Sequence, residues 1–363
     1  MIDNFKPLFN YLFLYYMFFS SYSIYAQNDI HNYQKMELQN DFKKSYEIYE
    51  EFEKEHGHFI QTPNTYMHYL TWGKITDTPL IWIHGSFNSS YEIREVVDEI
   101  VNAGYYVIAI DYYGHGKTNF PKQNVSIYNV VDDIRFLMDK LEINKAIIGG
   151  FSMGGTIATA FYDEYASKTL GIILENGGSA CWLNRYQNIE RHIVDKNVNE
   201  MYKWIRADTL FDSISEAFEY YRDKKNTAYK EFWLFNSIKE DKNGLWGYNY
   251  GLRNWLDQST PESYIKSIYT PTSSSLFISS LIMLQPNVIY RNLNVPLLIF
   301  DSQNDDNNDW DFNDNINLKQ SHPYYIDHII YEKTGHGLHF KHPKRFIEDV
   351  LSFLQKVKNY HAL

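Results

Sequence analysis

Ser152 stands in the segment Gly150-Phe-Ser-Met-Gly154, a spacing that could present a serine as a nucleophile. A short apolar run at 146–148 precedes this segment, and a helical pattern follows it at 156–168. A sharp turn between a strand and a helix exposes its serine only if glycines let neighbouring backbone come close. The first turn of the helix would also direct free N–H groups toward the reaction site. The plain alternative is a turn of small residues with no chemical role.

A nucleophilic serine needs an adjacent base, and the base needs a third group to orient it. We expect His336 to be the base, because it follows the last predicted strand and precedes the last predicted helix. The glycines on both sides of His336 suit a loop in which the imidazole reaches Ser152. His339 and His342 lie nearby in the sequence and remain alternatives.

The acidic loop 301–314 follows the penultimate predicted strand and is the expected source of the third group. We expect Asp305 to orient the base, since a loop residue about five positions past a strand can turn back toward a histidine. Asp301 and Asp306 remain alternatives. The loop does not match a twelve-residue calcium loop, which needs a central glycine and a terminal glutamate.

Two backbone N–H groups should stabilise the oxyanion of an acyl-transfer intermediate. The N–H of Met153, directly after the serine, is expected to be one of them. The other is expected in the loop His84-Gly-Ser-Phe-Asn-Ser89, where we favour the N–H of Ser86 and keep that of Phe87 as the alternative. We expect His84 to brace this loop rather than to act as a base.

The elements that must position these residues alternate between strands and helices. A helix at 41–56 and a hairpin formed by 59–61 and 66–72 come first. Alternation then predicts an α/β fold with a mostly parallel sheet covered on both faces, in which ligands bind at the carboxyl ends of the strands. The strands of this sheet are predicted at 79–83, 105–110, 146–148, 170–174, 296–300 and 325–331.

Five segments follow from this pattern. We predict a signal peptide at 1–26, a helical extension at 27–57, a core at 58–178 and 293–363, and a helical insertion at 179–292 that is rich in tryptophan. The signal peptide rests on a short apolar run that ends in small residues before Ala26, and it predicts export to the periplasm or the medium. No stable membrane anchor is expected after cleavage.

Composition excludes several classes of protein. Hydrophobic residues make up 44% of the chain, which excludes a disordered chain. The net charge of −11 gives no basic footprint for a nucleic-acid partner. The single cysteine, Cys181, cannot form an internal disulfide, and no motif implies a metal or organic cofactor.

The order of these motifs resembles the alpha/beta-hydrolase superfamily. The motifs are Leu80-Ile-Trp-Ile-His-Gly85, Asp111-Tyr-Tyr-Gly-His-Gly116, the Ser152 turn, the Asp305 loop and Gly335-His336. They are most similar to the branch with a helical cap inserted after the sixth core strand. The resemblance implies a Ser–His–Asp triad of Ser152, His336 and Asp305, and a pocket between core and cap. It argues against dehalogenases and epoxide hydrolases, which have Asp in place of this serine.

We therefore expect a secreted serine hydrolase that cleaves a carboxylic ester or lactone of mid-sized apolar shape through an acyl-enzyme. An aminopeptidase or amidase similar to proline iminopeptidases, or a C–C bond hydrolase, would use the same triad. The residue after Ser152 is Met rather than the Trp usual in proline iminopeptidases, which weakens the first of these alternatives. A silent binding protein on the same fold is the alternative outside the enzymes.

Overall fold

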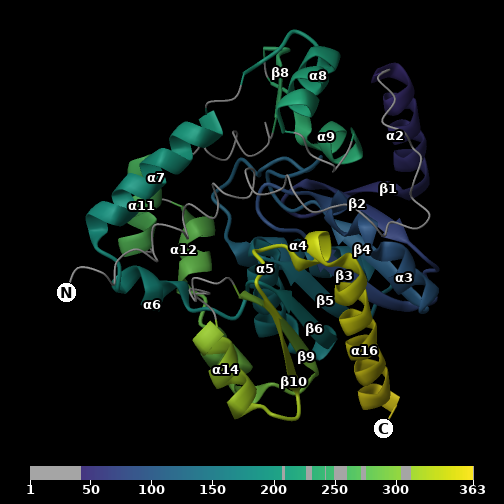
Figure 1. The fold of residues 1–363 in the computed structure, drawn as a ribbon, viewed down its shortest axis with the longest axis vertical. Coiled ribbons are helices and arrows are strands. Elements are labelled where there is room, and N and C mark those ends of the chain that lie inside the picture. The colour runs from purple at the N-terminus through teal and green to yellow at the C-terminus, as the bar shows by residue number, and fades with distance from the viewer. Residues whose placement is uncertain are drawn as a thin grey trace.

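A computed structural model describes residues 42–206, 209–225, 231–241, 243–248, 260–270, 275–303 and 312–362 (Figure 1). The predicted signal peptide and Asp305 lie outside these residues. In the described part of the chain, no helix has the length and apolar character needed to cross a membrane.

Within the described residues, eight strands form one sheet in the order β1-β2-β4-β3-β5-β6-β9-β10. The first three strands of this order pair antiparallel, and all later neighbours pair parallel. This confirms the predicted hairpin and the predicted mostly parallel α/β sheet. The strands are β1 (Gly57–Gln61), β2 (Tyr66–Trp72), β3 (Thr78–Ile83), β4 (Tyr105–Ile110), β5 (Ala146–Phe151), β6 (Thr169–Glu175), β9 (Leu297–Gln303) and β10 (Ile326–Glu332).

Helices cover both faces of the sheet because its central strands are apolar on both sides. In β3, Ile81 and Ile83 belong to one core cluster, and Leu80 and Trp82 belong to the other. The first face carries α4 (Ile127–Lys140), α5 (Met153–Tyr165) and α14 (Phe312–Ser321). The second face carries α2 (Phe42–His56), α3 (Val97–Asn102) and α16 (Pro343–Ala362). The short η1 (Ser90–Glu95) and α15 (Leu338–Lys341) also contribute to this face, and they follow the carboxyl ends of β3 and β10.

The chain between β6 and β9 is mainly helical, as its spacing predicts. It also contains an antiparallel hairpin, β7–β8, which the sequence analysis missed because strands of three residues are too short to show alternation. The elements are α6 (Trp182–Gln187), α7 (Arg191–Arg206), α8 (Ile214–Lys225), α9 (Glu231–Ser237), β7 (Ile238–Glu240), β8 (Trp246–Tyr248), α11 (Pro261–Tyr269), α12 (Leu276–Met283) and α13 (Pro286–Ile289).

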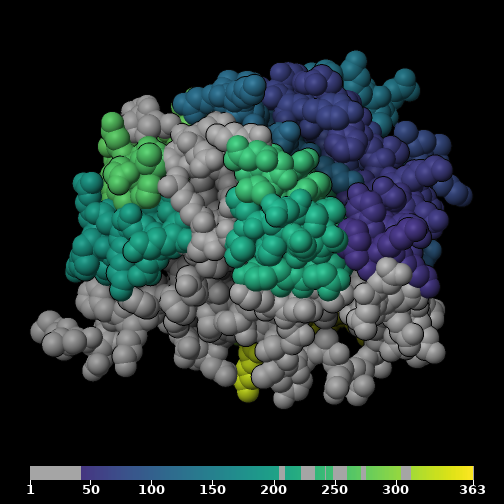
Figure 2. Space-filling view, turned by 90° about the horizontal axis from the view of Figure 1, so that it is seen from above, coloured from purple at the N-terminus to yellow at the C-terminus, as the bar shows by residue number. Residues whose placement is uncertain are grey.

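This insertion packs as two lobes. Helices α7, α11 and α12 share the core cluster of α4 and α5, whereas α8, α9 and β7 share the cluster of the second face. In the second lobe, Phe42 of α2 makes edge-on contacts with Phe218 at 5.5 Å and Phe235 at 5.6 Å between ring centroids. Figure 2 shows α2, in purple, beside the block that contains α8 and α9. Helix α2 therefore packs against both β1 and β2 of the sheet and α8 and α9 of the insertion.

Candidate active site

Ser152 occupies the turn between the last residue of β5 and the first residue of α5, as predicted. Its backbone has φ +53° and ψ −114°, a conformation that residues other than glycine seldom adopt. Its N–H donates to the carbonyl of Glu175 at 2.8 Å, which ties the turn to the end of β6. The surrounding structure thus holds the serine in a strained position at the carboxyl edge of the sheet.

The glycines around Ser152 are required by space. A Cβ on Gly150 would lie 2.3 Å from the carbonyl carbon of Gly154, and one on Gly154 would lie 1.9 Å from the carbonyl oxygen of Ile83. A Cβ on Gly177, after β6, would lie 2.2 Å from the carbonyl oxygen of Ser152. All of these neighbours are backbone atoms, which cannot move aside as a side chain can. The turn therefore exists only because three separate positions lack a side chain.

His336 lies in the loop after β10, and this loop folds back over the end of β5. The imidazole of His336 contacts the ring of Phe151, the residue before Ser152, at 4.7 Å between centroids. Burial lowers the pKa of His336 to about 3, and the charges of Lys341 and His339 act in the same direction. The imidazole is neutral at neutral pH, which is the form that a general base requires.

The alternative bases have other partners. His339 packs edge-on against Trp82 and donates from Nδ1 to Oε2 of Glu175 at 2.6 Å. Burial alone would lower the pKa of His339, but the charge and hydrogen bond of Glu175 raise it. His342 lies with Nε2 3.0 Å from Oγ1 of Thr334. The positions of both imidazoles are explained by these contacts.

Of the three candidate acids, only Asp301 lies within the described residues. Its Oδ2 accepts from Nε2 of His328 at 2.6 Å, and its Oδ1 accepts from Nδ2 of Asn315 at 2.7 Å. Both partners belong to the α14 edge of the molecule. Asp305 and Asp306 lie outside the described residues, so the orienting role of Asp305 stays a prediction.

The loop after β3 carries the expected second oxyanion donor, Ser86. In this loop, the N–H of Gly85 donates to Oε2 of Glu92 at 2.9 Å, and Phe87 adopts a left-handed φ of +65°. His84 donates from Nδ1 to the carbonyl of Gly85 at 2.7 Å, and burial lowers the pKa of His84 to about 4. A neutral, buried imidazole bonded to its own loop fits the expected bracing role of His84.

Met153, the other expected donor, is the first residue of α5. The first backbone bond of the helix runs from the N–H of Thr156 to the carbonyl of Ser152 at 3.3 Å, and a helix leaves its first N–H groups without intrahelical acceptors. The closeness of Gly154 to the carbonyls of Ile83 and His84 shows that the start of α5 packs on the end of β3. The two segments that carry the expected donors are therefore neighbours.

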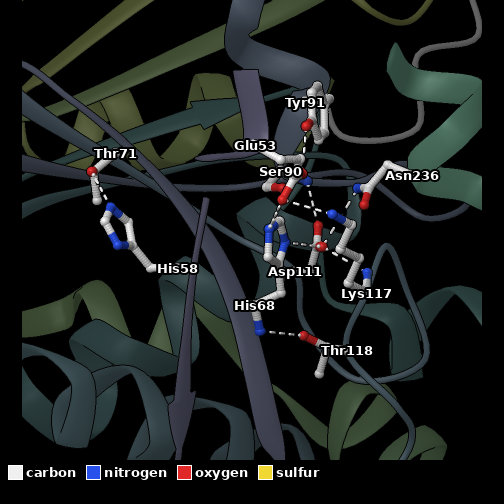
Figure 3. Close-up of polar contacts among 10 residues, drawn as sticks. All are labelled: Glu53, His58, His68, Thr71, Ser90, Tyr91, Asp111, Lys117, Thr118 and Asn236. Carbon is white, nitrogen blue, oxygen red and sulfur yellow. Dashed lines mark hydrogen bonds and ion pairs between the residues drawn. The ribbon is translucent and has the colours of Figure 1, made fainter. Parts of the chain in front are cut away.

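A second buried cluster supports the β3 loop from the side (Figure 3). Oδ1 of Asp111 accepts from the N–H of Ser90 at 2.6 Å, and Oδ2 accepts from Nδ1 of His68 at 2.7 Å. His68 reaches Oε2 of Glu53 with Nε2 at 3.2 Å, and Nζ of Lys117 lies 2.6 Å from the same oxygen. Glu53 and His68 carry no motif, so sequence reasoning missed both.

We expect Glu53→Gln to lower the free energy of unfolding by about 2–4 kcal/mol at neutral pH, because the largely buried pair of His68 and Glu53 loses one partner. Burial alone would raise the pKa of Glu53, but the hydrogen bond and charge of His68 and the charge of Lys117 lower it to about 2 from 4.5. A lowered folded-state pKa contributes stability that is present above about pH 4.5 and is lost as the pH falls toward 2. In urea unfolding, the difference between variant and native protein should therefore shrink by roughly a third to a half at pH 3.5.

Glu47→Gln, on the same helix, is the matched control. Its partner Lys43 is 4.0 Å away and both side chains are largely exposed, so we expect a change below about 0.5 kcal/mol. A destabilisation by Glu53→Gln that does not change with pH would contradict the ionic role of Glu53.

Within the described residues, no group of three or more His, Cys, Asp or Glu side chains is arranged to hold a metal ion. The geometry instead gathers a strained serine, a neutral buried histidine and the start of a helix at one edge of a parallel sheet. This combination defines a hydrolase of the alpha/beta type.

The family model for the alpha/beta hydrolase fold matches residues 78–343, and the chain belongs to this family. A carboxylesterase from Nitrososphaera gargenis superimposes with a TM-score of 0.56 at 18% identity, over 83% of this chain and 99% of that one. The carboxylesterase CesB from Bacillus subtilis superimposes with a TM-score of 0.55 at 15% identity, over 86% and 97%. At these identities the likeness concerns the fold.

Among sequence relatives, the AB hydrolase superfamily protein YisY of Bacillus subtilis is 23% identical over 190 residues, which are 51% of this chain and 68% of YisY. The sn-1-specific diacylglycerol lipase ABHD11 of Danio rerio is 35% identical over 88 residues, 24% of this chain and 27% of the lipase. The chain thus spans about a quarter of the length of this lipase.

Proposed function

We propose that the protein is a carboxylic ester hydrolase in which Ser152 is the nucleophile, His336 the base and Asp305 the group that orients His336. The observation that supports this most is the backbone of Ser152, a non-glycine residue at φ +53° directly before α5. A strained backbone of this kind persists only where the surrounding structure holds it in place. In this turn, the strained conformation presents the serine hydroxyl at the edge of the sheet.

In the proposed reaction, Oγ of Ser152 attacks the ester carbon while His336 takes the hydroxyl proton. The carbonyl oxygen becomes an oxyanion that accepts hydrogen bonds from the N–H groups of Met153 and Ser86. His336 then gives its proton to the leaving alcohol, which leaves an acyl-Ser152 ester. A water that loses a proton to His336 attacks this ester. His336 then returns the proton to Oγ of Ser152, which releases the acid and restores the free serine.

We propose a mid-sized apolar ester or lactone as the substrate. This class is favoured by four partly buried apolar side chains, which belong to the two donor segments and to the start of the insertion. They would offer apolar surface to an acyl or alkoxy group. They are Phe87, Met153, Trp182 and Tyr186, and the last two stack at 6.0 Å between ring centroids. We also propose that the protein acts after export, on the basis of its predicted signal peptide.

A substrate panel on the purified chain tests this function. We expect turnover of nitrophenyl esters and aryl lactones that exceeds turnover of aminoacyl naphthylamides by about 100-fold or more, because an alkoxide or phenoxide leaves more readily than an amine. A fluorophosphonate probe should label the peptide that contains Ser152. A protein that neither hydrolyses any ester nor reacts with the probe would contradict the proposal, and a preference for the naphthylamides would favour a peptidase.

A further inference from the structure

Glu92 is a fully buried carboxylate that the proposed reaction does not use. It lies in η1, directly after the loop 84–89, and only 2% of it is exposed. Its Oε2 accepts from the N–H of Gly85 at 2.9 Å, and its Oε1 accepts from Nε1–H of Trp82 at 3.0 Å. Burial of a carboxylate is costly unless such donors compensate it. Both donors belong to the end of β3 and the loop that follows, so Glu92 fixes the backbone one residue before Ser86.

A second buried carboxylate, Glu175, holds the opposite loop. Its side chain accepts from the N–H groups of Leu338 and His339, and from Nδ1–H of His339 at 2.6 Å. These bonds anchor α15, which begins two residues after His336. The carbonyl of Glu175 also accepts from the N–H of Ser152. One residue at the end of β6 therefore contacts both the nucleophile turn and the loop of the expected base.

The rings of Phe151 and His339 fill the space between these two loops. Phe151 contacts His336 at 4.7 Å and His339 at 5.2 Å between centroids. A Cβ on Gly85 would lie 2.6 Å from the ring of Phe151, so the loop after β3 rests directly on this ring. His339 also contacts Trp82, the other donor to Glu92. The nucleophile strand and the two loops are thus packed against one another through the rings of Phe151 and His339.

We propose that Glu92 is a positioning residue. By accepting the N–H of Gly85, it sets the direction of the Ser86 N–H toward the oxyanion. Glu92 also accepts from Trp82, which packs on His339, and His339 bonds to Glu175; these contacts connect the loop after β3 to the loop that carries His336. The proposal rests on the proposed function, because it concerns the oxyanion donor of the same reaction. Glu92 does not touch the reacting atoms. Its effect arises because an oxyanion donor that is displaced by a fraction of an ångström loses much of its contribution to the transition state.

Glu92→Leu removes both acceptors and leaves the N–H groups of Gly85 and Trp82 buried without partners. We expect kcat on a nitrophenyl ester to fall about 10- to 100-fold with KM changed less than about threefold, because the donor acts on the transition state rather than on the bound ester. A role in stability alone would not separate kcat from KM in folded protein.

Asp133→Leu is the matched control. Asp133 is also fully buried and also accepts hydrogen bonds from neutral donors, among them Tyr113 Oη–H at 2.6 Å and Asn64 Nδ2–H at 2.9 Å. Its loss should destabilise the fold to a similar extent and leave kcat within about threefold of the native value. Equal losses of kcat in the two variants would show that Glu92 acts through stability, and would overturn the proposal.

Glu92→Gln is the conservative variant, and it serves if Glu92→Leu does not fold. Burial raises the pKa of Glu92 to about 7; the charge of Glu175 also raises it, whereas the charge of His339 and the two donors lower it. The native side chain is therefore largely neutral below neutral pH, and an amide oxygen can still accept from the N–H of Gly85. We expect this variant to keep kcat within about threefold at pH 6. A loss at pH 6 as large as that of Glu92→Leu would overturn the proposal, because the acceptor alone would not suffice.

Hydrogen exchange separates this proposal from the proposed function. Exchange measured on the peptide that covers 84–89 should speed up at least about tenfold in Glu92→Leu and remain unchanged in Asp133→Leu, because only the first loses the acceptor of Gly85. Unchanged exchange in this peptide overturns the positioning role whatever the chemistry. Faster exchange in Glu92→Leu, together with a native chain that hydrolyses no ester, would refute the proposed function and leave the structural role of Glu92 intact.

Discussion

Ser152→Ala is expected to lower kcat on a nitrophenyl ester by about 10³-fold or more, because the acyl-enzyme can no longer form. The fold should persist, since the hydroxyl is not needed for the N–H bond that ties the turn to Glu175. Steady-state kinetics on the purified variant, with circular dichroism as the check on folding, measures both. The fluorophosphonate label should vanish at the same time.

The control for this variant is Ser321→Ala at the end of α14. Ser321 bonds to the carbonyl of Asn317 in an exposed position, so its loss should leave kcat within about twofold. Turnover by Ser152→Ala within tenfold of the native rate would contradict the nucleophile assignment. Such a result would indicate a reaction on the same fold that does not form an acyl-enzyme.

Gly154→Ala is expected to prevent normal folding or to destabilise the protein by more than about 4 kcal/mol. The added Cβ would lie 1.9 Å from the carbonyl oxygen of Ile83 and 2.6 Å from that of His84. Both oxygens belong to the backbone at the end of a central strand, so relief requires α5 to move away from β3. Thermal unfolding, or the yield of soluble protein if none unfolds cooperatively, measures the effect.

Gly104→Ala is the control that separates a steric clash from an unfavourable backbone conformation. Gly104 has a left-handed φ of +86°, and its Cβ would meet nothing within 4 Å. This variant should cost only about 1–2 kcal/mol, the penalty for a side chain in that conformation. A Gly154→Ala protein that unfolds within a few degrees of Gly104→Ala would show that the contact of α5 with β3 is less rigid than the structure indicates.

Part of the support for the site comes from outside the segment that matches the family model. Glu53 of α2 and His68 of β2 precede residue 78. Glu53 bonds to His68, and His68 bonds to Asp111, which accepts the N–H of Ser90 at the start of η1. Helix α2 also packs on Phe218 and Phe235 of the insertion. Residues 42–77 are thus part of the folded hydrolase and contribute to the support of its β3 loop.

The sequence by itself determined the class of fold and the location of the nucleophile turn. Alternation of apolar runs with helical patterns is a local property, and it predicted the parallel sheet that the structure contains. The glycines around Ser152 were equally readable, because their requirement follows from the geometry of one turn. The structure shows the atoms that require them, at Ile83 and within the turn itself.

Only the tertiary structure decided which charged residues surround that turn. Glu92 and Glu175 carry no motif, and His339 stood out only as an alternative base. These residues belong to three separate segments, and their contacts depend on how the strands and loops pack. The same holds for Glu53 and His68. A hydrogen bond between residues distant in the chain leaves no periodic trace in the sequence, because neither partner constrains its own neighbours. Patterns that repeat along one element can therefore be read from the chain, whereas a buried polar network requires the packed fold.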